Sequence, residues 1–432
     1  MGGGPEPERV VSAPPAGAVG SAGAVGARRV PVQSRGTVPQ PQPQPQPSRS
    51  GSGSGARGAG TGAVRVAVVG LGWAGRSIWL PRLRDHPRFT VAAAVDLDVD
   101  ARAAVAADGV DAPLLASPDL LRPDEIDLAV VAVPNHLHSA VGGQLLAAGL
   151  PVFLEKPVCL SGAQADELAR AERAGGAALL AGSAARCRAD VRALYTLARA
   201  CGTIRHVELA WVRARGVPDA GGWFTDTARA GGGALLDLGW HLLDTVAPLV
   251  GTAAFTQVVG TVSADFVRSG VGGASWRHAG DPDSGRHEAA RRRRGDVEDT
   301  ARGFLVTETG VSVSLRASWA SHEALDSTVI RVEGSAGTAT LSCTFGFSPN
   351  RRDGSVLTYK RDGDTVRVPV PTEPVGAEYA RQLDELPGLL ADPGTRGRAV
   401  AEARRAVDAV ERFYRSARSP AVVGGGPRSG GI

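Results

Sequence analysis

The sequence contains few cysteines and no long apolar run. Its 432 residues include four cysteines, and Cys159, Cys187, Cys201 and Cys343 show no paired spacing. A chain of this length can build its core without disulfides, so we expect reduced thiols. No stretch approaches the roughly 18 apolar residues of a membrane helix, and the N-terminus lacks the apolar core of a signal peptide. These absences predict a soluble, cytoplasmic protein.

Lysine is almost absent as well. Of the 48 Lys and Arg residues, only Lys156 and Lys360 are lysines. Arginine keeps its proton in a protein, whereas a buried lysine can shift its pKa and exchange a proton. Lys156 and Lys360 are therefore the positions where an ammonium group itself could matter.

The first 63 residues have almost no large apolar side chains and carry the whole formal net charge of +4. They hold six Arg and two Glu, so the remaining residues balance at 42 cationic and 42 acidic side chains. The segment includes the runs PQPQPQPQPS and GSGSGARGAG. Such a composition cannot bury enough apolar surface to offset chain entropy. We predict a disordered tail at 1–63 and no nucleic-acid partner.

Residues 64–182 alternate between short apolar runs and helical stretches. Such alternation is typical of a parallel sheet covered by helices on both faces. We therefore predict a doubly wound Rossmann domain at 64–185. Apolar runs lie at 64–69, 90–95, 128–133, 151–155 and 177–182, and helices are expected near 74–86, 99–107, 139–148 and 162–175.

The character of the chain changes after a helix expected near 189–200. Long stretches with a period of two indicate an antiparallel sheet, so we predict an α+β domain at 186–417. A polar, Gly-rich run at 267–296 interrupts it, and we expect a flexible insertion there and a second disordered tail at 418–432. The period-2 stretches are 204–213, 255–266, 301–319, 327–333 and 338–345, and helices are expected near 233–249, 376–391 and 397–416.

Four consecutive arginines, Arg291 to Arg294, lie inside the predicted insertion. They could form a patch for phosphate or nucleic acid, but charge runs in solvated insertions are commoner. We favour the solvated insertion.

A glycine-rich turn follows the first apolar run directly and opens the first helix. Its sequence is Gly70-Leu71-Gly72-Trp73-Ala74-Gly75. In a dinucleotide site the first glycine permits the tight turn, the second lets the backbone approach the pyrophosphate, and the third lets helix and strand pack closely. The helix N-terminus then offers free amide donors to the phosphates. The turn predicts a dinucleotide site that includes Trp73 and Ala74.

An acidic residue follows the second apolar run. Asp96 lies 21 residues after Gly75, where a carboxylate can accept hydrogen bonds from both hydroxyls of the adenosine ribose. The same carboxylate repels a 2′-phosphate, so the sequence favours NAD. NADP is the alternative, because Arg102 lies close in sequence.

Two further motifs carry ionisable groups. Glu155-Lys156-Pro157 stands at the carboxyl end of the apolar run at 151–155, and ligands bind beyond the carboxyl ends of strands in an open α/β sheet. The second motif is GGGALLDLGWHLLD, in which Asp237, His241 and Asp244 are spaced i, i+4 and i+7. We expect these three side chains on one side of a helix, with Leu238, Leu242 and Val246 packing on another.

The second motif has a simpler interpretation, in which Asp237 and His241 merely stabilise the helix. The preceding glycine triplet argues against this, since it costs helix stability and is useful where the backbone must approach something closely. His136 and His138 could suggest a metal site, but we find no further ligands at suitable spacing and expect none.

GLGWAG, PNHLH, EKP and GGGALLDLGWH occur in the order and spacing of a known family. On these motifs the chain resembles the glucose-fructose oxidoreductase / inositol dehydrogenase / rhizopine catabolism (Gfo/Idh/MocA) family over about 64–416, outside the insertion. The resemblance implies a Rossmann domain and a domain with a large, mostly antiparallel open sheet. It also implies homodimers or homotetramers formed through the open sheet face, and NAD or NADP as cofactor.

The resemblance also implies roles for individual residues. Lys156 matches the family's catalytic lysine, Asp237 its substrate-side aspartate and His241 its acid/base histidine. Pro134, Asn135 and His138 match a segment beside the nicotinamide, and Glu155 and Lys156 join them there. Arg186 matches a substrate-facing arginine.

Chemistry agrees with these roles, because hydride leaves a carbinol carbon only as its hydroxyl loses a proton. A histidine such as His241 is a suitable base, Lys156 can stabilise the developing alkoxide, and Asp237 can orient His241 or a substrate hydroxyl. We predict a dehydrogenase or ketoreductase for a cyclitol, sugar, aminosugar or nucleotide sugar. Trp211, Trp223 and Trp240 could line a sugar site or pack in the core.

Two other functions fit the same motifs. One is an NAD-requiring glycosidase of the same superfamily, which would release free sugar without net change in NADH. The other is a non-catalytic regulator that senses a dinucleotide. The presence of Lys156, Asp237 and His241 together argues against the regulator.

Overall fold

The computed structural model describes residues 62–219, 222–274 and 295–418, and all of them belong to one compact unit, Ala59–Ile432. The predicted tails at 1–63 and 418–432 fall almost wholly outside these ranges. So does most of the predicted insertion, including Arg291 to Arg294. Within the described ranges, no helix is long and apolar enough to cross a membrane.

Six parallel strands form the first sheet, in the order β3-β2-β1-β4-β5-β6. This strand order is that of a Rossmann domain, so the predicted doubly wound fold is confirmed. The strands are β1 (Val64–Val69), β2 (Phe89–Val95), β3 (Leu114–Leu115), β4 (Leu128–Val131), β5 (Val152–Leu154) and β6 (Leu179–Ala181).

Helices connect these strands in the alternating pattern of the sequence. The helix α4 (Gly162–Gly175) shows the local reasons: the Ser161 hydroxyl accepts a hydrogen bond from the Gln164 amide at its start, and Gly176 ends it with φ of +63°. The others are a π-helical turn η1 (Ala74–Trp79), α1 (Leu80–Asp85), α2 (Val99–Ala107), α3 (His138–Ala147) and the short 3₁₀ turns η2 (Pro118–Leu120) and η3 (Asn135–Leu137).

Eight strands form the second sheet, in the order β14-β13-β12-β11-β7-β10-β9-β8. Among the described strands of this sheet, only the β7–β10 pair is parallel, so the predicted mostly antiparallel sheet is confirmed. The single period-2 stretch predicted at 301–319 forms two antiparallel strands, β9 and β10, joined as a hairpin. The strands are β7 (Ile204–Val212), β8 (Phe255–Ser263), β9 (Thr300–Thr307), β10 (Ser312–Ser318), β11 (Ser327–Gly334), β12 (Gly337–Cys343), β13 (Val356–Arg361) and β14 (Asp364–Val368).

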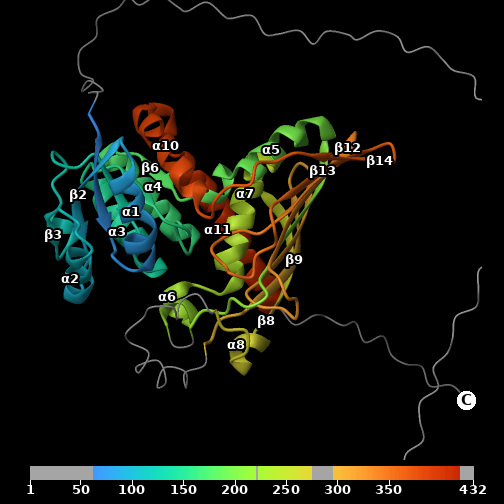
Figure 1. Cartoon of the computed structure of the whole chain (residues 1–432), viewed down its shortest axis with the longest axis horizontal. Coiled ribbons are helices and arrows are strands. Elements are labelled where there is room, and N and C mark those ends of the chain that lie inside the picture. The colour runs from blue at the N-terminus through green and yellow to red at the C-terminus, as the bar shows by residue number, and fades with distance from the viewer. Residues whose placement is uncertain (1–61, 220–221, 275–294, 419–432) are drawn as a thin grey trace, which may run out of the picture. The chain divides into compact units, whose positions relative to one another are not determined.

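One face of the second sheet packs against α5 (Ala189–Ala198), α7 (Trp240–Val250) and α11 (Arg398–Arg418) (Figure 1). At Gly260 and Gly303, an added Cβ would lie 2.3 and 2.1 Å from ring atoms of Phe413, so these glycines let α11 approach the sheet. The shorter elements are η4 (Ala184–Cys187), η5 (Arg199–Cys201), η6 (Trp223–Thr225), α6 (Thr227–Ala230), η7 (Leu235–Gly239), α8 (Asp265–Ser269) and η9 (Pro393–Thr395).

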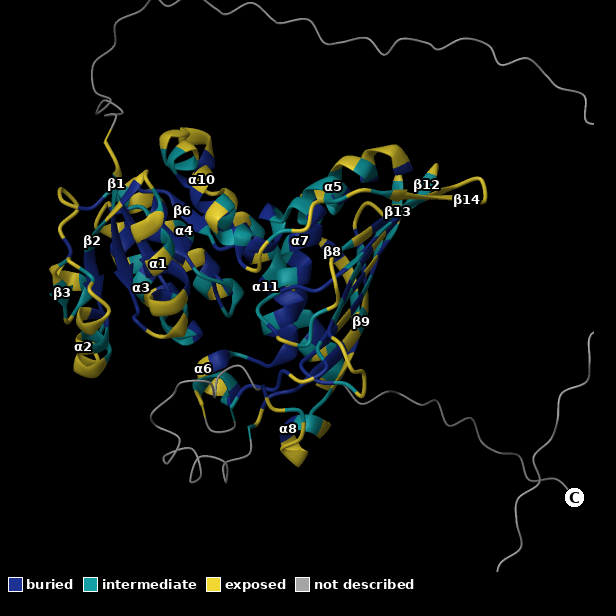
Figure 2. Cartoon of the chain, viewed as in Figure 1, coloured by how far each residue is buried: buried dark blue, intermediate teal, exposed yellow. Residues whose placement is uncertain are grey.

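The helix α10 (Ala377–Ala391) packs against the Rossmann domain. Its Leu383 and Leu386 are buried in one apolar cluster with Val66 and Val68 of β1. A larger apolar cluster continues from the other face of the Rossmann sheet into the second domain. Figure 2 shows the buried strands and α7 in dark blue. The two domains therefore share packed surfaces, and residues from both can form one site.

Candidate active site

The glycine turn after β1 adopts the geometry that its sequence predicts. Gly70 has φ of +95°, and a Cβ there would lie 2.7 Å from the carbonyl carbon of Ala132. At Gly75, a Cβ would lie 1.9 Å from the backbone oxygen of Gly70. A Cβ on Gly72 would meet no atom within 4 Å, so this part of the backbone faces open space. A pyrophosphate can therefore approach the turn at Gly72.

A cavity of about 670 Å³ begins at this turn and extends between the two domains. Its walls include the turn, the ends of β2 and β4, the loop after β5, the end of β7 and the η7–α7 segment. Predicted site residues on its wall are Gly70, Gly72, Trp73, Ala74, Asp96, Pro134, Asn135, His138, Glu155, Lys156, Asp237 and His241. Within the described residues, no group of three His, Cys, Asp or Glu side chains is placed to hold a metal ion.

Asp96 lies at the carboxyl end of β2, at the wall of the cavity. Its Oδ2 accepts a hydrogen bond from the Leu71 amide at 2.7 Å, and its Oδ1 accepts one from the Asp98 amide at 2.9 Å. Each carboxylate oxygen can accept a second donor. Arg102 donates to the Asp96 carbonyl oxygen at 2.6 Å, so its guanidinium is held beside the same strand end.

The side chains of Asn135 and His138 form hydrogen bonds to backbone carbonyl groups of the protein. The Asn135 amide donates to the Ala230 carbonyl at 2.9 Å. The His138 ring nitrogens lie 2.7 Å from the Pro157 carbonyl oxygen and 2.8 Å from that of Val133, and burial lowers the pKa of His138. Both residues line the cavity, and these hydrogen bonds fix the surrounding loops.

Glu155 holds the segment that carries Lys156. Its carboxylate accepts hydrogen bonds from the Trp79 indole at 2.8 Å and from the Lys156 amide at 3.0 Å. Burial raises its pKa, against the opposing effect of the Lys156 charge. Glu155 therefore positions the turn at the cis Lys156–Pro157 peptide bond.

Lys156 and Asp237 form an ion pair across the two domains. The ammonium nitrogen lies 2.5 Å from Oδ1 of Asp237, and the Trp319 indole donates to Oδ2 at 2.8 Å. Burial alone would raise the pKa of Asp237. The charges of Lys156 and Arg213 and the hydrogen bond from Lys156 outweigh it and hold that pKa well below its usual range.

His241 faces the same cavity one helical turn after Asp237. Burial lowers the pKa of His241 to about 3, and the Lys156 charge adds to this effect while Asp237 opposes it. The ring is therefore neutral at pH 7. Its centroid lies 5.5 Å from that of Trp211, and among the described residues no side chain hydrogen-bonds to its nitrogens. The imidazole is free to accept a proton from a ligand.

A buried carboxylate caps the segment that carries Asp237 and His241. Glu298 accepts hydrogen bonds from the amides of Gly233 and Leu235 and from the Tyr414 hydroxyl. A Cβ on Gly232 would lie 2.1 Å from the Tyr414 oxygen, and one on Gly233 would lie 1.8 Å from the Glu298 carbonyl oxygen. The glycine triplet thus serves close approach, as expected, but to Tyr414 and Glu298.

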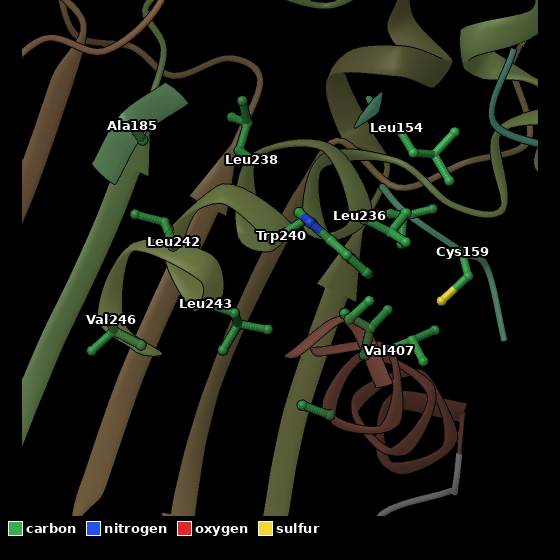
Figure 3. Close-up of a cluster of buried hydrophobic side chains, with 14 of the residues drawn as sticks. Leu154, Cys159, Ala185, Leu236, Leu238, Trp240, Leu242, Leu243, Val246 and Val407 are labelled. Atoms are coloured by element: carbon green, nitrogen blue, oxygen red, sulfur yellow. The ribbon is translucent and has the colours of Figure 1, made fainter. Parts of the chain in front are cut away.

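The prediction that Asp244 shares a side with Asp237 and His241 is wrong. The helix begins as the π turn η7, which changes the angular spacing along it. Asp244 instead lines a separate cavity of about 40 Å³, where burial raises its pKa to about 6. The predicted apolar side is confirmed, since Leu238, Leu242 and Val246 are buried in the core (Figure 3).

Arg186 lies in that smaller cavity as well. Its guanidinium is 2.6 Å from Oδ1 of Asp244 and 2.8 Å from Oε2 of Glu402. The structure therefore does not bring Arg186 to the cavity of Lys156 and His241.

Several residues in or next to the cavity were not predicted from the sequence: Arg213 and Phe224 line it, and the buried Trp319 lies behind Asp237. Trp319 binds Asp237, Arg213 lies near enough to lower the pKa values of Asp237 and His241, and Phe224 lies 6.0 Å from the Lys156 ammonium. No spacing signal marks them, because they come from separate elements. Of the three tryptophans considered above, Trp211 and Trp223 line the cavity, whereas Trp240 packs in the core (Figure 3).

Two family models match the chain. An oxidoreductase family with an NAD-binding Rossmann fold (GFO_IDH_MocA) matches residues 64–183, and the GFO/IDH/MocA C-terminal domain matches residues 196–340. The chain is also 62% identical to a "putative UDP-kanosamine synthase oxidoreductase subunit" of Amycolatopsis mediterranei, over 82% of this chain and 96% of that protein. An inositol 2-dehydrogenase of Paenarthrobacter aurescens is 35% identical over 26% of this chain and 33% of its own length.

Solved structures share the fold. GenD2 from gentamicin A biosynthesis, solved with NAD, superposes with a TM-score of 0.64 at 24% identity, covering 84% of this chain and 97% of its own. A 3-ketoreductase from Actinomadura kijaniata, solved with NADP and TDP-benzene, gives 0.63 at 19% identity, covering 82% and 98%. In both cases the similarity is in the two-domain fold.

Proposed function

Because the chain belongs to the Gfo/Idh/MocA family of NAD(P)-binding oxidoreductases, we propose that it oxidises one hydroxyl of a UDP-linked hexose to a ketone. The observation that carries the proposal is the placement of Lys156, Asp237 and His241 on one cavity with the glycine turn. The sugar class comes from the relative in Amycolatopsis mediterranei. Kanosamine is a glucose with an amine at C3, so the hydroxyl proposed for oxidation is the one on C3.

The cavity suits a dinucleotide, since Gly72 leaves open space at the turn and Asp96 lies at the neighbouring strand end. A bound nicotinamide would accept the hydride of the sugar carbon. We propose NAD as the cofactor, because the Asp96 carboxylate repels a 2′-phosphate.

His241 would act as the base. Its neutral imidazole accepts the hydroxyl proton as the carbon loses hydride. The Lys156 ammonium then hydrogen-bonds the developing alkoxide, and Asp237 holds that ammonium in place through the 2.5 Å contact. Trp319 fixes Asp237 in turn.

A ketone on the sugar is the group that an amine condenses with. We therefore propose that a separate aminating enzyme consumes the product, in keeping with the word "subunit" in the relative's name. Removal of the ketone would also draw an unfavourable oxidation forward.

We further propose that the open face of the second sheet joins two copies of the chain. Val259 and Phe304 pair across β8 and β9, and they are 65% and 47% exposed on the face opposite to α11. Exposed apolar pairs on a sheet favour association. Light scattering should give a dimer or tetramer that Phe304→Asp weakens, and a monomeric wild type would overturn this.

The experiment for the activity incubates the protein with NAD and UDP-glucose, with hydroxylamine added to trap the ketone. We expect NADH absorbance to rise and NMR to locate an oxime at C3. Release of free glucose without net NADH would instead indicate the glycosidase. No NADH with UDP-glucose, but turnover of inositol or free sugars, would overturn the UDP-hexose proposal.

A further inference from the structure

Tyr379 lies on the wall of the large cavity, and the proposed chemistry does not use it. It belongs to the first turn of α10, the helix that packs against the Rossmann domain. The side chain is partly exposed, and its hydroxyl forms no hydrogen bond to any described residue. A tyrosine hydroxyl in a largely buried position usually has a partner, because leaving it without one costs free energy. The hydroxyl can therefore donate to or accept from a ligand in the cavity.

Three contacts fix the ring of Tyr379. Its centroid lies 5.6 Å from that of Trp79 in an edge-to-face arrangement, and 5.6 Å from that of Phe347 in a stacked arrangement. The guanidinium carbon of Arg82 lies over the ring, 5.4 Å from its centre. Since these contacts cover much of the ring and hold it in place, the hydroxyl end is the part of the side chain left for the cavity.

The hydroxyl lies at the end of the cavity that carries Lys156 and Asp237. Trp79, which contacts the Tyr379 ring, donates from its indole to Glu155 at 2.8 Å. Burial raises the pKa of Tyr379, and the charges of Glu155 and Asp237 add to this effect, so both carboxylates lie close to the hydroxyl. The hydroxyl therefore keeps its proton at neutral pH.

The strand order assigns this end of the cavity to the nicotinamide half of a dinucleotide. The turn at Gly70 and Gly72 suits the pyrophosphate, and Asp96 at the end of β2 suits the adenosine ribose. In the sheet, β2 and β5 lie on opposite sides of β1. A dinucleotide with its pyrophosphate at the turn and its adenosine at β2 thus directs its other half toward β5, where Glu155 and Tyr379 lie.

We propose that the Tyr379 hydroxyl hydrogen-bonds the carboxamide of the bound nicotinamide. The carboxamide is the hydrogen-bonding group of the nicotinamide, and such a bond restricts rotation of the ring about its link to the ribose. This inference rests on the nicotinamide cofactor of the proposed function and does not depend on the sugar.

The test compares NAD with ADP-ribose, which contains every part of NAD except the nicotinamide. Calorimetry without sugar measures the affinity of both for wild type and for Tyr379→Phe, which removes only the hydroxyl. NAD binding should weaken about 3- to 10-fold, the loss expected for one neutral hydrogen bond. ADP-ribose binding should stay within about twofold of wild type, since the turn at Gly70 holds its pyrophosphate.

The matched control removes a different tyrosine hydroxyl. Tyr359 of β13 donates to the carbonyls of Ala200 and Ala336, and it does not line the cavity. Tyr359→Phe should bind NAD and ADP-ribose as the wild type does. Thermal unfolding of both variants shows whether each is folded at the temperature of the titrations.

Two results would overturn the proposal. One is a folded Tyr379→Phe protein that binds NAD as tightly as wild type. If its KM for the sugar were raised at the same time, the hydroxyl would belong to the substrate. The other is an equal loss of affinity for NAD and ADP-ribose, because the hydroxyl would then act on the ADP-ribose part or through the fold.

The outcome is separable from that of the proposed reaction, because neither titration needs turnover. NAD affinity that depends on Tyr379, in a protein that oxidises no UDP-hexose, would support the hydrogen bond and refute the reaction. Oxidation of UDP-glucose by a protein whose NAD affinity does not depend on Tyr379 would refute the hydrogen bond alone.

Discussion

The ammonium of Lys156 lies 2.5 Å from Oδ1 of Asp237, and this contact joins the two domains. Lys156 follows β5 of the Rossmann sheet, whereas Asp237 belongs to the π turn that opens α7. The lysine's position is fixed by Glu155, and the aspartate's by Trp319. The proposed reacting groups therefore come together only when the domains pack.

Lys156→Met and His241→Gln should each lower turnover about 10²- to 10⁴-fold. Lys156→Met removes the proposed hydrogen-bond donor to the developing alkoxide, and His241→Gln removes the proposed acceptor of the hydroxyl proton. NAD affinity should change less than about twofold, since the glycine turn is untouched. Initial rates of NADH formation and fluorescence titration with NAD measure the two effects.

The matched control for Lys156 is Lys360→Met, which removes the other lysine of the chain, an exposed residue of β13. It should leave the rate unchanged. Rates of the Lys156 and His241 variants equal to that of wild type would refute their assignment.

The low pKa of His241 predicts how stability depends on pH. Its folded pKa of about 3 lies below the ordinary 6.5, so between these values only the unfolded chain binds the proton, and stability is lost as pH falls. His241→Gln removes this loss. The variant should gain about 1–2 kcal/mol relative to wild type between about pH 7 and about pH 5, allowing for the partly solvated ring.

Urea unfolding of both proteins at the two pH values measures this difference. Equal changes in unfolding free energy for wild type and His241→Gln would mean that the histidine is not held neutral by burial and by Lys156.

Much of the fold follows from local patterns. The alternating apolar runs predict the Rossmann sheet because each buried strand is a short continuous segment, and the period-2 stretches predict most of the second sheet. The hairpin β13–β14 was missed because its strands are short and polar. Its turn still carries a signal, since Asp362 and Gly363 have φ of +52° and +88° and form the Asp-Gly pair that such turns prefer.

The site was predictable only where its residues share a motif. Asp237 and His241 lie four apart and reach one cavity, but the π turn, which sequence periodicity does not reveal, removes Asp244 from their side. Glu298 and Trp319 touch the same segment from positions more than 60 residues away. Such contacts depend on tertiary packing, so no spacing along the chain encodes them.

Asp96 should decide between NAD and NADP. Asp96→Ala should lower the ratio of NAD to NADP affinity about tenfold, because it removes a charged hydrogen-bond acceptor for the ribose hydroxyls and the repulsion of a 2′-phosphate. Asp96→Asn provides a milder change, since its amide oxygen can still accept from the Leu71 amide at the turn.

The control is Asp98→Asn, which alters the neighbouring acid that caps α2. Fluorescence titrations with both dinucleotides give the ratios. An unaltered ratio in Asp96→Ala would remove the physical reason for preferring NAD.

Arg186 should act on stability and not on the substrate. Arg186→Gln breaks the contacts to Asp244 and Glu402 and leaves a buried carboxylate whose pKa burial already raises to about 6. Loss of one partner of a buried ion pair costs about 3–5 kcal/mol, and partial exposure of these side chains reduces the expected cost to about 2–4 kcal/mol. Asp244→Asn in the same variant should recover part of the lost stability, because the neutral amide needs no cationic partner.

Below the unfolding temperature, KM for the sugar should stay within about twofold of wild type, since Arg186 lies outside the large cavity. A KM raised severalfold in a protein of unchanged stability would instead place Arg186 at the substrate, as its resemblance to a substrate-facing arginine implies.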